Sequence, residues 1–146
     1  MSLTTFLENI ATRALLSKSE RARLGQLVIN DAGHGYDVLG LHAQSVATAV
    51  ALLRPVYELW FRVESQGAEH VPARGAAILA ANHSGMLPID AAMITIDVLR
   101  HTTPPRVPRA VGDGFVPFLP WLGTVFSRAG MVSGSRGNFR HLLDTD

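Results

Sequence analysis

An uninterrupted apolar run over residues 76–81 constrains the fold of this chain more than any other stretch. The run has the length of one strand, and a strand without polar residues is expected to be buried on both faces, as in a parallel sheet. A polar turn over residues 82–85 follows at once, and Pro88 then stands where it can open a helix that runs to about Leu99. A buried strand that leads through a turn into a helix is typical of α/β domains.

The second half of the chain repeats this alternation of strands and helices. Apolar residues at every second position predict a short strand over residues 61–65. Further strands are predicted over residues 107–111, 123–126 and 129–132, and a helix over residues 138–143. The predicted fold class is therefore α/β, with a largely parallel sheet flanked by helices and preceded by N-terminal helices.

Residues 1–56 form a predicted helical region ahead of a domain that spans residues 57–146. The region begins with two short amphipathic helices, continues through a glycine-containing loop over residues 31–40, and ends in a helix from about residue 42. Pro55 lies near the end of this last helix and predicts a kink or a restart there.

The two N-terminal helices admit two interpretations. Ser17 and Glu20 have the spacing of a capping box, which opens the second helix. We expect both helices to pack on the core. The alternative is that they rest on a membrane surface and point their basic side chains towards the headgroups, namely Arg13, Lys18, Arg21 and Arg23.

The composition is that of a globular protein and excludes several kinds of chemistry. The 146 residues are 47% hydrophobic and 17% charged, which suits one domain with a sizeable core and excludes a disordered chain. No cysteine is present, so disulfides, thiolate metal sites and a cysteine nucleophile are excluded. No apolar run approaches the roughly 20 residues of a transmembrane helix, and no secretory signal is recognisable. No paired histidines or carboxylate cluster predicts a metal site, and no Gly-x-Ser-x-Gly turn predicts a serine hydrolase.

Charge is unevenly distributed along the chain, although the net charge is only +1. Residues 98–141 contain a single acidic residue, Asp113, and six arginines: Arg100, Arg106, Arg109, Arg128, Arg136 and Arg140. A solvated surface position is the simpler interpretation of any one arginine, but the group as a whole fits an anionic ligand or surface. No nucleic-acid-binding motif accompanies it, so nucleic acid is not a predicted partner.

The segment from Ala80 to Asp90 carries the residues best suited to catalysis. His83 stands at the carboxyl end of the predicted strand, where parallel α/β sheets gather their ligands, and Asp90 lies in the first turn of the next helix. A carboxylate that accepts from Nδ1 would leave Nε2 free to take a proton from a hydroxyl. Spacing alone leaves simpler interpretations open, because Asp90 also suits the helix dipole and His83 also suits a loop histidine bonded to backbone.

The segment also carries a family resemblance. Asn82-His83-Ser84-Gly85, followed by Leu87-Pro88 and Asp90, resembles the first signature block of the phospholipid/glycerol acyltransferase superfamily, and most closely its bacterial branch with a Leu-Pro step before the aspartate. The resemblance begins near Tyr57 and continues to about Leu143, so it covers roughly the last 90 residues of the chain.

The resemblance implies an enzyme that moves a fatty acyl group from acyl-CoA or an acyl-carrier protein to a hydroxyl of a glycerol phosphate, lysophospholipid or related lipid. His83 would be the general base, Asp90 would orient it, and no cofactor is implied. The turn residues Asn82, Ser84 and Gly85 would shape the site and donate to the developing oxyanion. The resemblance extends to a glycine-led strand that ends in an arginine near the acceptor phosphate, here 123–128, which makes Arg128 the substrate-binding candidate and Arg136 its competitor.

An enzyme of this kind needs an apolar groove for the fatty chain and access to lipid. The sequence offers Met86, Leu87, Phe115, Phe118 and Trp121 as candidates for the groove. Peripheral membrane contact is expected, and with it a cytoplasmic location at the inner face of the cell membrane.

Two departures from the family pattern qualify these expectations. Six residues separate His83 from Asp90, where the common form of the block has four, so the aspartate must fold back from the helix start. The family's third block, a Phe-Pro-Glu-Gly-type strand and turn, has no counterpart here, so the C-terminal part of the domain is expected to be missing. That gap supports an alternative function, a non-catalytic lipid- or membrane-binding module that retains the acyltransferase fold.

Overall fold

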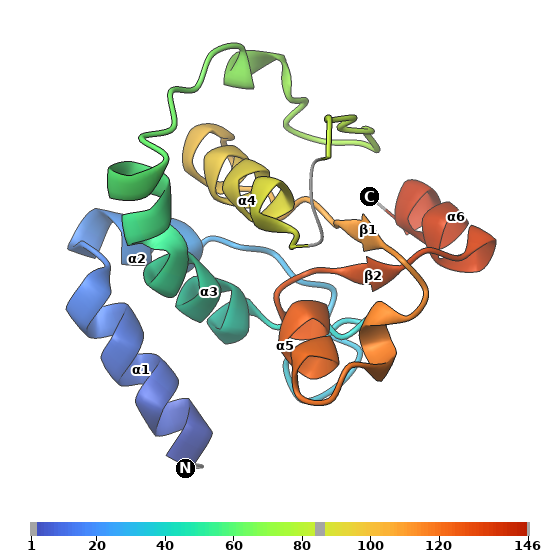
Figure 1. Ribbon diagram of the computed structural model, residues 1–146, viewed down its shortest axis with the longest axis horizontal. Helices are drawn as coiled ribbons and strands as arrows, with labels where there is room; N and C mark the ends of the chain where they lie inside the picture. Colours follow the sequence, from blue (N-terminus) through green and yellow to red (C-terminus); the bar gives the residue numbers. More distant parts are fainter. Residues whose placement is uncertain (1–2, 84–86, 146) are drawn as a thin grey trace.

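A computed structural model describes residues 3–83 and 87–145 of the chain (Figure 1). The α-helices are α1 (Leu3–Leu15), α2 (Lys18–Leu24), α3 (Ala43–Pro55), α4 (Ile89–His101), α5 (Leu122–Arg128) and α6 (Arg136–Thr145). A π-helix, η1 (Val56–Trp60), continues α3 past Pro55, and two short 3-10 turns are η2 (Ala68–His70) and η3 (Val116–Phe118). The strands are β1 (Val111–Gly112) and β2 (Val132–Ser133).

The two strands pair in parallel, with Val111 opposite Val132 and Gly112 opposite Ser133. The backbone N–H of Val132 donates to Ala110 O at 2.8 Å, which continues the pairing by one residue. The chain passes from β1 to β2 through η3 and α5, as parallel pairing requires a crossover connection. A mixed helix–strand fold with parallel pairing is thus confirmed. The sheet in the described part of the chain is smaller than predicted, because it has two strands.

The apolar run 76–81, predicted as a strand buried on both faces, is neither a strand nor buried. Every residue of it is exposed, with Ile78 at 66% and Leu79 at 47%. A strand buried in this way needs a paired neighbour on each side and a packed layer on each face. No strand within residues 3–83 or 87–145 pairs with this run, so the pattern alone does not bury it.

The strand predicted over residues 61–65 is also wrong, because these residues lack regular structure and follow directly on η1, which ends at Trp60. The prediction that Pro55 marks a kink or restart is met by η1, whose wider turn is closed by the Phe61 N–H donating to Val56 O at 2.9 Å. Arg62 then takes a left-handed conformation with φ 49°, which ends the helix in the manner of a C-terminal cap. A residue in that conformation interrupts the extended backbone that a strand requires.

Residues 123–126 were predicted as a strand but lie within α5, a helix. The Gly123 N–H donates to Leu119 O at 3.0 Å and the Val125 N–H donates to Trp121 O at 3.2 Å, which is helical bonding. Short apolar runs cannot be assigned to strand or helix by periodicity. Of the strands predicted over residues 107–111 and 129–132, only the last residue of each lies in a strand. Val111 begins β1 and Val132 begins β2.

The predicted helices match the structure well. Helix α4 follows Pro88 and α6 covers the predicted helix at residues 138–143. Ser17 and Glu20 form the predicted capping box, in which the Glu20 N–H donates to Ser17 Oγ and the Ser17 N–H donates to Glu20 Oε2 at 2.8 Å. A cap of this kind contributes about 1 kcal/mol to helix stability.

The hydrophobic core lies where α3 meets α1 and α4. Figure 1 shows α3 running between these two helices. The core members are Leu16, Leu41, Val46, Val50, Ala51, Tyr57, Met93, Ile96 and Leu99. The expectation that the N-terminal helices pack on the core is confirmed by α1, whose contacts are mainly with α3, and by the burial of Leu16. The predicted boundary between residues 56 and 57 stays a prediction.

Among the described helices, none has both the length and the hydropathy needed to cross a bilayer.

Candidate active site

His83 and Asp90 are in direct contact. The Nδ1 atom of His83 lies 2.7 Å from Oδ2 of Asp90, and Oδ1 of the same carboxylate accepts from the Ala91 N–H at 2.8 Å. Asp90 is in the first turn of α4 and reaches His83 from there, so the six-residue spacing does not prevent the pairing. A neutral imidazole that donates from Nδ1 to a carboxylate keeps a lone pair on Nε2, which is the form that a general base needs.

The pair lies at the surface, because the His83 side chain is 58% exposed and the Asp90 side chain 32%. Asn82 is exposed beside His83. Ser84 and Gly85, the other predicted turn residues, lie outside the described residues, as does Met86. The exposed imidazole is accessible to a substrate. Its Nδ1 contacts the carboxylate of Asp90, which lies in the first turn of α4.

Arg128 does not stand at the end of a strand, as the sequence predicted, because residues 122–128 are helical. Its guanidinium carbon lies 5.5 Å from the centroid of the Tyr36 ring, a cation–π contact. Its carbonyl accepts from the His42 N–H at 3.1 Å. These contacts fasten Arg128 to the loop ahead of α3.

Arg136 has the setting that Arg128 was expected to have. Gly130, with φ 109°, turns the chain from α5 into β2, and Arg136 follows β2 as the first residue of α6. The segment 130–136 thus runs from a glycine through β2 to an arginine, whereas 123–128 is helical. The Arg136 side chain is exposed, and no carboxylate among the described residues lies within ion-pair distance of it.

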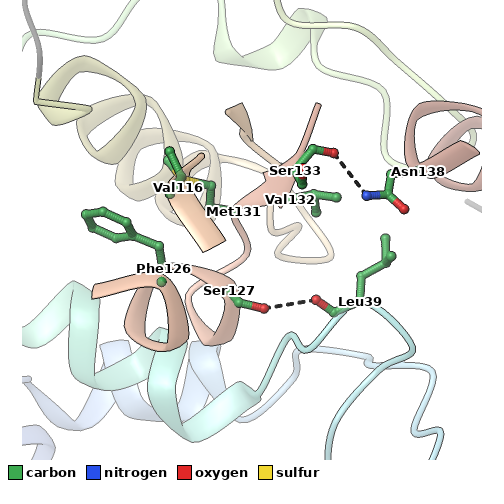
Figure 2. Close-up of a pocket in the computed structure, with 9 residues that line it drawn as sticks. Leu39, Val116, Phe126, Ser127, Met131, Val132, Ser133 and Asn138 are labelled. Carbon is green, nitrogen blue, oxygen red and sulfur yellow. Dashed lines mark hydrogen bonds between the residues drawn. The ribbon is translucent and has the colours of Figure 1, made fainter. Parts of the chain in front are cut away.

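A small cavity of about 180 Å³ lies beneath the turn from β2 to α6 (Figure 2). Its lining residues are Leu39, Val116, Gly123, Phe126, Ser127, Met131, Val132, Ser133 and Asn138. Asn138 Nδ2 donates to Ser133 O at 3.0 Å and Ser127 Oγ donates to Leu39 O at 3.1 Å, so these polar groups are engaged with backbone. None of the lining residues titrates near neutral pH, so the cavity supplies no acid or base to the site.

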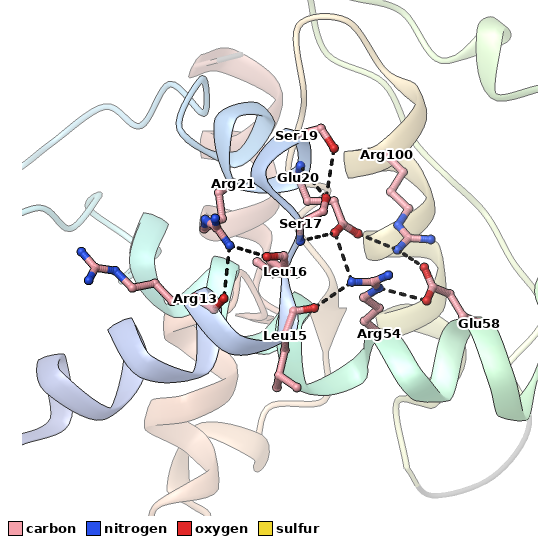
Figure 3. Close-up of polar contacts among 10 residues, drawn as sticks. All are labelled: Arg13, Leu15, Leu16, Ser17, Ser19, Glu20, Arg21, Arg54, Glu58 and Arg100. Atoms are coloured by element: carbon pink, nitrogen blue, oxygen red, sulfur yellow. Dashed lines mark hydrogen bonds and ion pairs between the residues drawn. The ribbon is translucent and has the colours of Figure 1, made fainter.

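An ion-pair network holds α4, the helix that carries Asp90, against the rest of the protein (Figure 3). Arg100 NH2 lies 2.6 Å from Glu58 Oε1 and 3.0 Å from Glu20 Oε1. Arg54 pairs with the same two carboxylates, at 2.9 Å from Glu58 and 3.2 Å from Glu20. The network joins α2, α3, η1 and α4. The sequence signals only the Arg54–Glu58 pair, through its spacing of four; the other contacts span 34 residues or more.

The network perturbs the pKa values of its members. Hydrogen bonds from Arg100 lower the pKa of Glu58, against a smaller opposing effect of burial. Burial by itself would raise the pKa of Glu20, but the hydrogen bonds from Ser17 and the charges of Arg54 and Arg100 outweigh it and leave that pKa lowered. Both carboxylates are therefore ionised at neutral pH, as the ion pairs require.

Two of the arginines considered for headgroup contact bind backbone instead. Arg23 Nε donates to Leu99 O at 2.7 Å, and its NH2 donates to Thr102 O. Arg21 NH1 donates to Arg13 O at 3.3 Å and also to Leu16 O. Cations at these positions satisfy carbonyl groups at the C-terminal ends of α4 and α1. Arg21 and Arg23 are therefore engaged with backbone carbonyls, and the membrane-surface interpretation of these helices stays a prediction.

Within the part of the chain that the structure describes, no group of three or more histidine, cysteine, aspartate or glutamate side chains could hold a metal ion.

Comparison with known proteins places this sequence in a family. The family model described as acyltransferase matches residues 62–145, more than half of the chain. An uncharacterized protein of Mycobacterium tuberculosis (strain ATCC 25618 / H37Rv) is 39% identical over 92 residues, which are 63% of this chain and 26% of that protein. An uncharacterized protein of Mycobacterium leprae (strain TN) is 33% identical over 97 residues, 64% of this chain and 26% of that protein.

The chain thus spans about a quarter of the length of the curated relatives that it matches. No solved structure matches it. The matched residues 62–145 include the histidine–aspartate pair and both candidate arginines, and they agree with the extent of the resemblance seen in the sequence. The chain belongs to the acyltransferase family.

Proposed function

We propose that this protein is an O-acyltransferase that moves a fatty acyl group from an acyl-CoA or acyl-carrier-protein thioester to a hydroxyl of a glycerol phosphate, lysophospholipid or related lipid. Membership of the acyltransferase family indicates acyl transfer in general. The observation that carries the proposal is the 2.7 Å contact between His83 Nδ1 and Asp90 Oδ2 on an exposed imidazole.

His83 acts as the general base in this proposal. Its Nε2 takes the proton of the acceptor hydroxyl while the hydroxyl oxygen attacks the thioester carbonyl carbon. The tetrahedral intermediate then collapses, the carbon–sulfur bond breaks, and the imidazolium returns the proton to the departing thiolate. Asp90 fixes the ring and stabilises the imidazolium, and proton transfer by such a base contributes roughly 10² to 10⁴-fold to the rate. No cofactor is needed for this sequence of steps.

Acceptor binding is assigned in the proposal to Arg136 rather than Arg128. Arg136 is exposed at the end of the β2 segment, and a guanidinium can bind phosphate through two parallel hydrogen bonds. Arg128 is held by Tyr36 and the loop ahead of α3. Asn82, next to the base, is the proposed donor to the developing oxyanion, together with the turn residues Ser84 and Gly85.

Peripheral contact with the cytoplasmic face of the membrane is also proposed. Its support is the uncharged segment between Asp113 and Arg128, in which Phe118 is 85% exposed and Trp121 is 88% exposed. The segment satisfies its own backbone through turns and helix, for example by the Phe118 N–H donating to Phe115 O at 3.0 Å. Backbone that is satisfied internally and aromatic side chains that face outward both favour the bilayer interface.

The decisive experiment measures thiol release from acyl-CoA and from acyl-carrier-protein thioester by the purified protein. A panel of glycerol phosphate and lysophospholipid acceptors is compared for the native protein and His83→Ala. We expect acceptor-dependent release that falls by roughly 10² to 10⁴-fold in the variant. Release that is absent from the native protein, or unchanged in His83→Ala, would favour the non-catalytic lipid-binding module.

The chain offers a matched control. His101 Nδ1 lies 3.3 Å from Asp97 Oδ1 on α4, a second exposed histidine–aspartate pair without a proposed catalytic role. His101→Ala should therefore leave release unchanged. Arg136→Ala should raise KM for phosphate-bearing acceptors more than for acceptors without phosphate. Arg128→Ala should change KM to the same extent for both kinds of acceptor.

A further inference from the structure

Helix α1 packs on the protein with its polar side. Among residues 6–15, Thr12 is the one buried residue, with 6% of its surface exposed. Its Oγ1 donates to Glu8 O at 3.0 Å, as a buried hydroxyl requires a hydrogen-bond partner. The Glu8 side chain reaches α3, where Ser45 Oγ donates to Glu8 Oε1 at 3.4 Å. The side of α1 that faces α3 is therefore largely polar.

The apolar side chains of α1 form an outer stripe, made of Phe6, Leu7, Ile10 and Ala14. The first three are 47%, 56% and 48% exposed, and Ala14 is exposed as well. Successive residues of an α-helix are about 100° apart, so Ile10 lies about 200° around the helix from Thr12 and points away from α3. Figure 1 shows α1 at the margin of the molecule, with α3 on its inner side. An amphipathic helix normally buries its apolar stripe in the core of its own chain, whereas α1 presents it to the outside.

The outer stripe is complementary to a second copy of itself. In an antiparallel pair of α1 helices with a two-fold axis at Ile10, residues equally spaced on either side of Ile10 face each other. Phe6 of one copy then meets Ala14 of the other, so that a large side chain lies opposite a small one, and Ile10 meets Ile10. Positions 7, 10 and 14 also have the alternating spacings of three and four residues that are typical of the seam between paired helices. The small Ala14 lets the two helix axes approach to about 8–10 Å.

The charges of α1 favour a second copy over a lipid surface as the occupant of the outer stripe. Helices that rest on a bilayer are rich in lysine and arginine on their polar side and carry tryptophan on the other. Residues 3–15 contain one cation, Arg13, and no tryptophan. Arg13 borders the stripe, where its long stem can lie along a partner helix while its charge stays in water. A net charge of only +1 also gives little repulsion between two copies.

We propose that the outer stripe of α1 binds the same stripe of a second copy of this chain, in an antiparallel helix pair with its two-fold axis at Ile10. This contact goes beyond the proposed function and does not depend on it. Figure 1 shows α3 between α1 and α4, the helix that carries Asp90, so the pairing leaves the histidine–aspartate pair uncovered. Helix α1 has 13 residues and is about 20 Å long. An interface of that length is at the small end of specific contacts, and we expect a dissociation constant on the order of micromolar.

Sedimentation equilibrium of the purified protein measures the pairing. We expect a reversible monomer–dimer equilibrium. Ile10→Glu should raise the dissociation constant roughly 100-fold, because a substitution counts twice in a symmetric dimer and each copy contributes about tenfold. Ala14→Arg, which puts a long side chain opposite Phe6, should also weaken the dimer and serves if Ile10→Glu fails to fold. Val28→Glu, at an apolar position outside α1 that is 86% exposed, should leave the constant unchanged. A native protein that stays monomeric well above micromolar concentration would overturn the proposal.

Cysteine substitution tests the antiparallel geometry, because the natural chain has no cysteine and any disulfide then joins two copies. Ile10→Cys places two cysteines at the two-fold axis, within the Cα separation of about 4.4–6.8 Å that a disulfide allows, and should crosslink rapidly on mild oxidation. Phe6→Cys should crosslink rapidly only when mixed with Ala14→Cys, because its own equivalent in the partner lies about 12 Å away along the helix pair. Val28→Cys is the exposed control and should crosslink slowly. Phe6→Cys that crosslinks as fast alone as in the mixture would refute the antiparallel pair.

Vesicles of equal parts phosphatidylcholine and phosphatidylglycerol separate a second copy from a lipid surface as the occupant. Ile10→Glu should sediment with these vesicles as the native protein does. If Ile10→Glu instead loses vesicle binding, the outer stripe contacts lipid and the proposal is refuted. Thiol release is a separate measurement: a dimer without release supports this proposal while the proposed function fails, and release by a protein that is monomeric throughout does the reverse.

Discussion

The contact between His83 and Asp90 leads to a quantitative prediction for Asp90→Asn. Asparagine keeps the shape of aspartate but removes its charge, and so weakens the hold on Nδ1. A hydrogen bond to a charged group contributes about 1.5–3 kcal/mol. With the histidine 58% exposed and the aspartate 32% exposed, solvent reduces that value, and we take the lower half of the range. A loss of about 1.5–2 kcal/mol corresponds to a roughly 10- to 30-fold fall in kcat/KM.

The assay is steady-state thiol release with saturating acyl-CoA and the best acceptor found for the native protein. Asp144→Asn is the matched control, because Asp144 is an exposed carboxylate on a different helix, α6. We expect the control to retain the native rate and Asp90→Asn to fall while its KM for the acceptor stays within about twofold. That pattern is expected of an interaction that acts mainly in the transition state.

A thermal melt accompanies the assay, because Asp90 also lies in the first turn of α4. Loss of a first-turn carboxylate costs about 0.3–1 kcal/mol through the helix dipole, which lowers Tm by only a few degrees. Full activity in Asp90→Asn would refute the orienting role. So would a loss of activity that follows the fraction of unfolded protein at the assay temperature.

Two predictions concern stability. Glu20→Gln should destabilise the protein by about 1 kcal/mol at neutral pH. In urea titrations this difference from the native protein should shrink below the ordinary glutamate pKa of 4.5 and vanish once the pH is below the lowered pKa of Glu20 in the folded protein. The sign follows from the lowered pKa of Glu20, since a carboxyl of this kind stabilises the fold only while ionised. Gly40→Ala should lower Tm by roughly 5–10 °C, because a Cβ there would lie 2.5 Å from Ser127 Oγ at φ 89°. Gly75→Ala, at φ 83° with open space around it, should show only the backbone strain; an equal effect of both substitutions would exclude the contact with Ser127.

Local signals in the sequence were sufficient for the α-helices other than α5 and for the His83–Asp90 pair. Pro88 marked the start of α4, and Ser17 with Glu20 marked the start of α2, because caps and helix starts depend on residues three or four apart. His83 and Asp90 are only seven residues apart across a helix start, so their contact also depends mainly on local geometry.

The strands were predicted less well, because strand pairing depends on residues that lie far apart in the sequence. A strand is stable only with a partner, and the partner of β1 is β2, about 20 residues later in the chain. The runs 61–65, 76–81 and 123–126 look like strands by composition, yet they are an irregular segment after η1, an exposed segment and part of α5. The arginine that follows a paired strand is therefore Arg136, which composition could not decide.

By itself, the sequence determined the family and predicted the contact between His83 and Asp90, because a short motif and a helix start contain that information. Tertiary structure alone decided what surrounds them. Apart from the local Arg54–Glu58 pair, the ion pairs among Glu20, Arg54, Glu58 and Arg100 join residues 34 or more positions apart, which meet only when α2, α3, η1 and α4 pack together. Packing brings such residues together through burial of the core, and no local pattern records which distant side chains it will join.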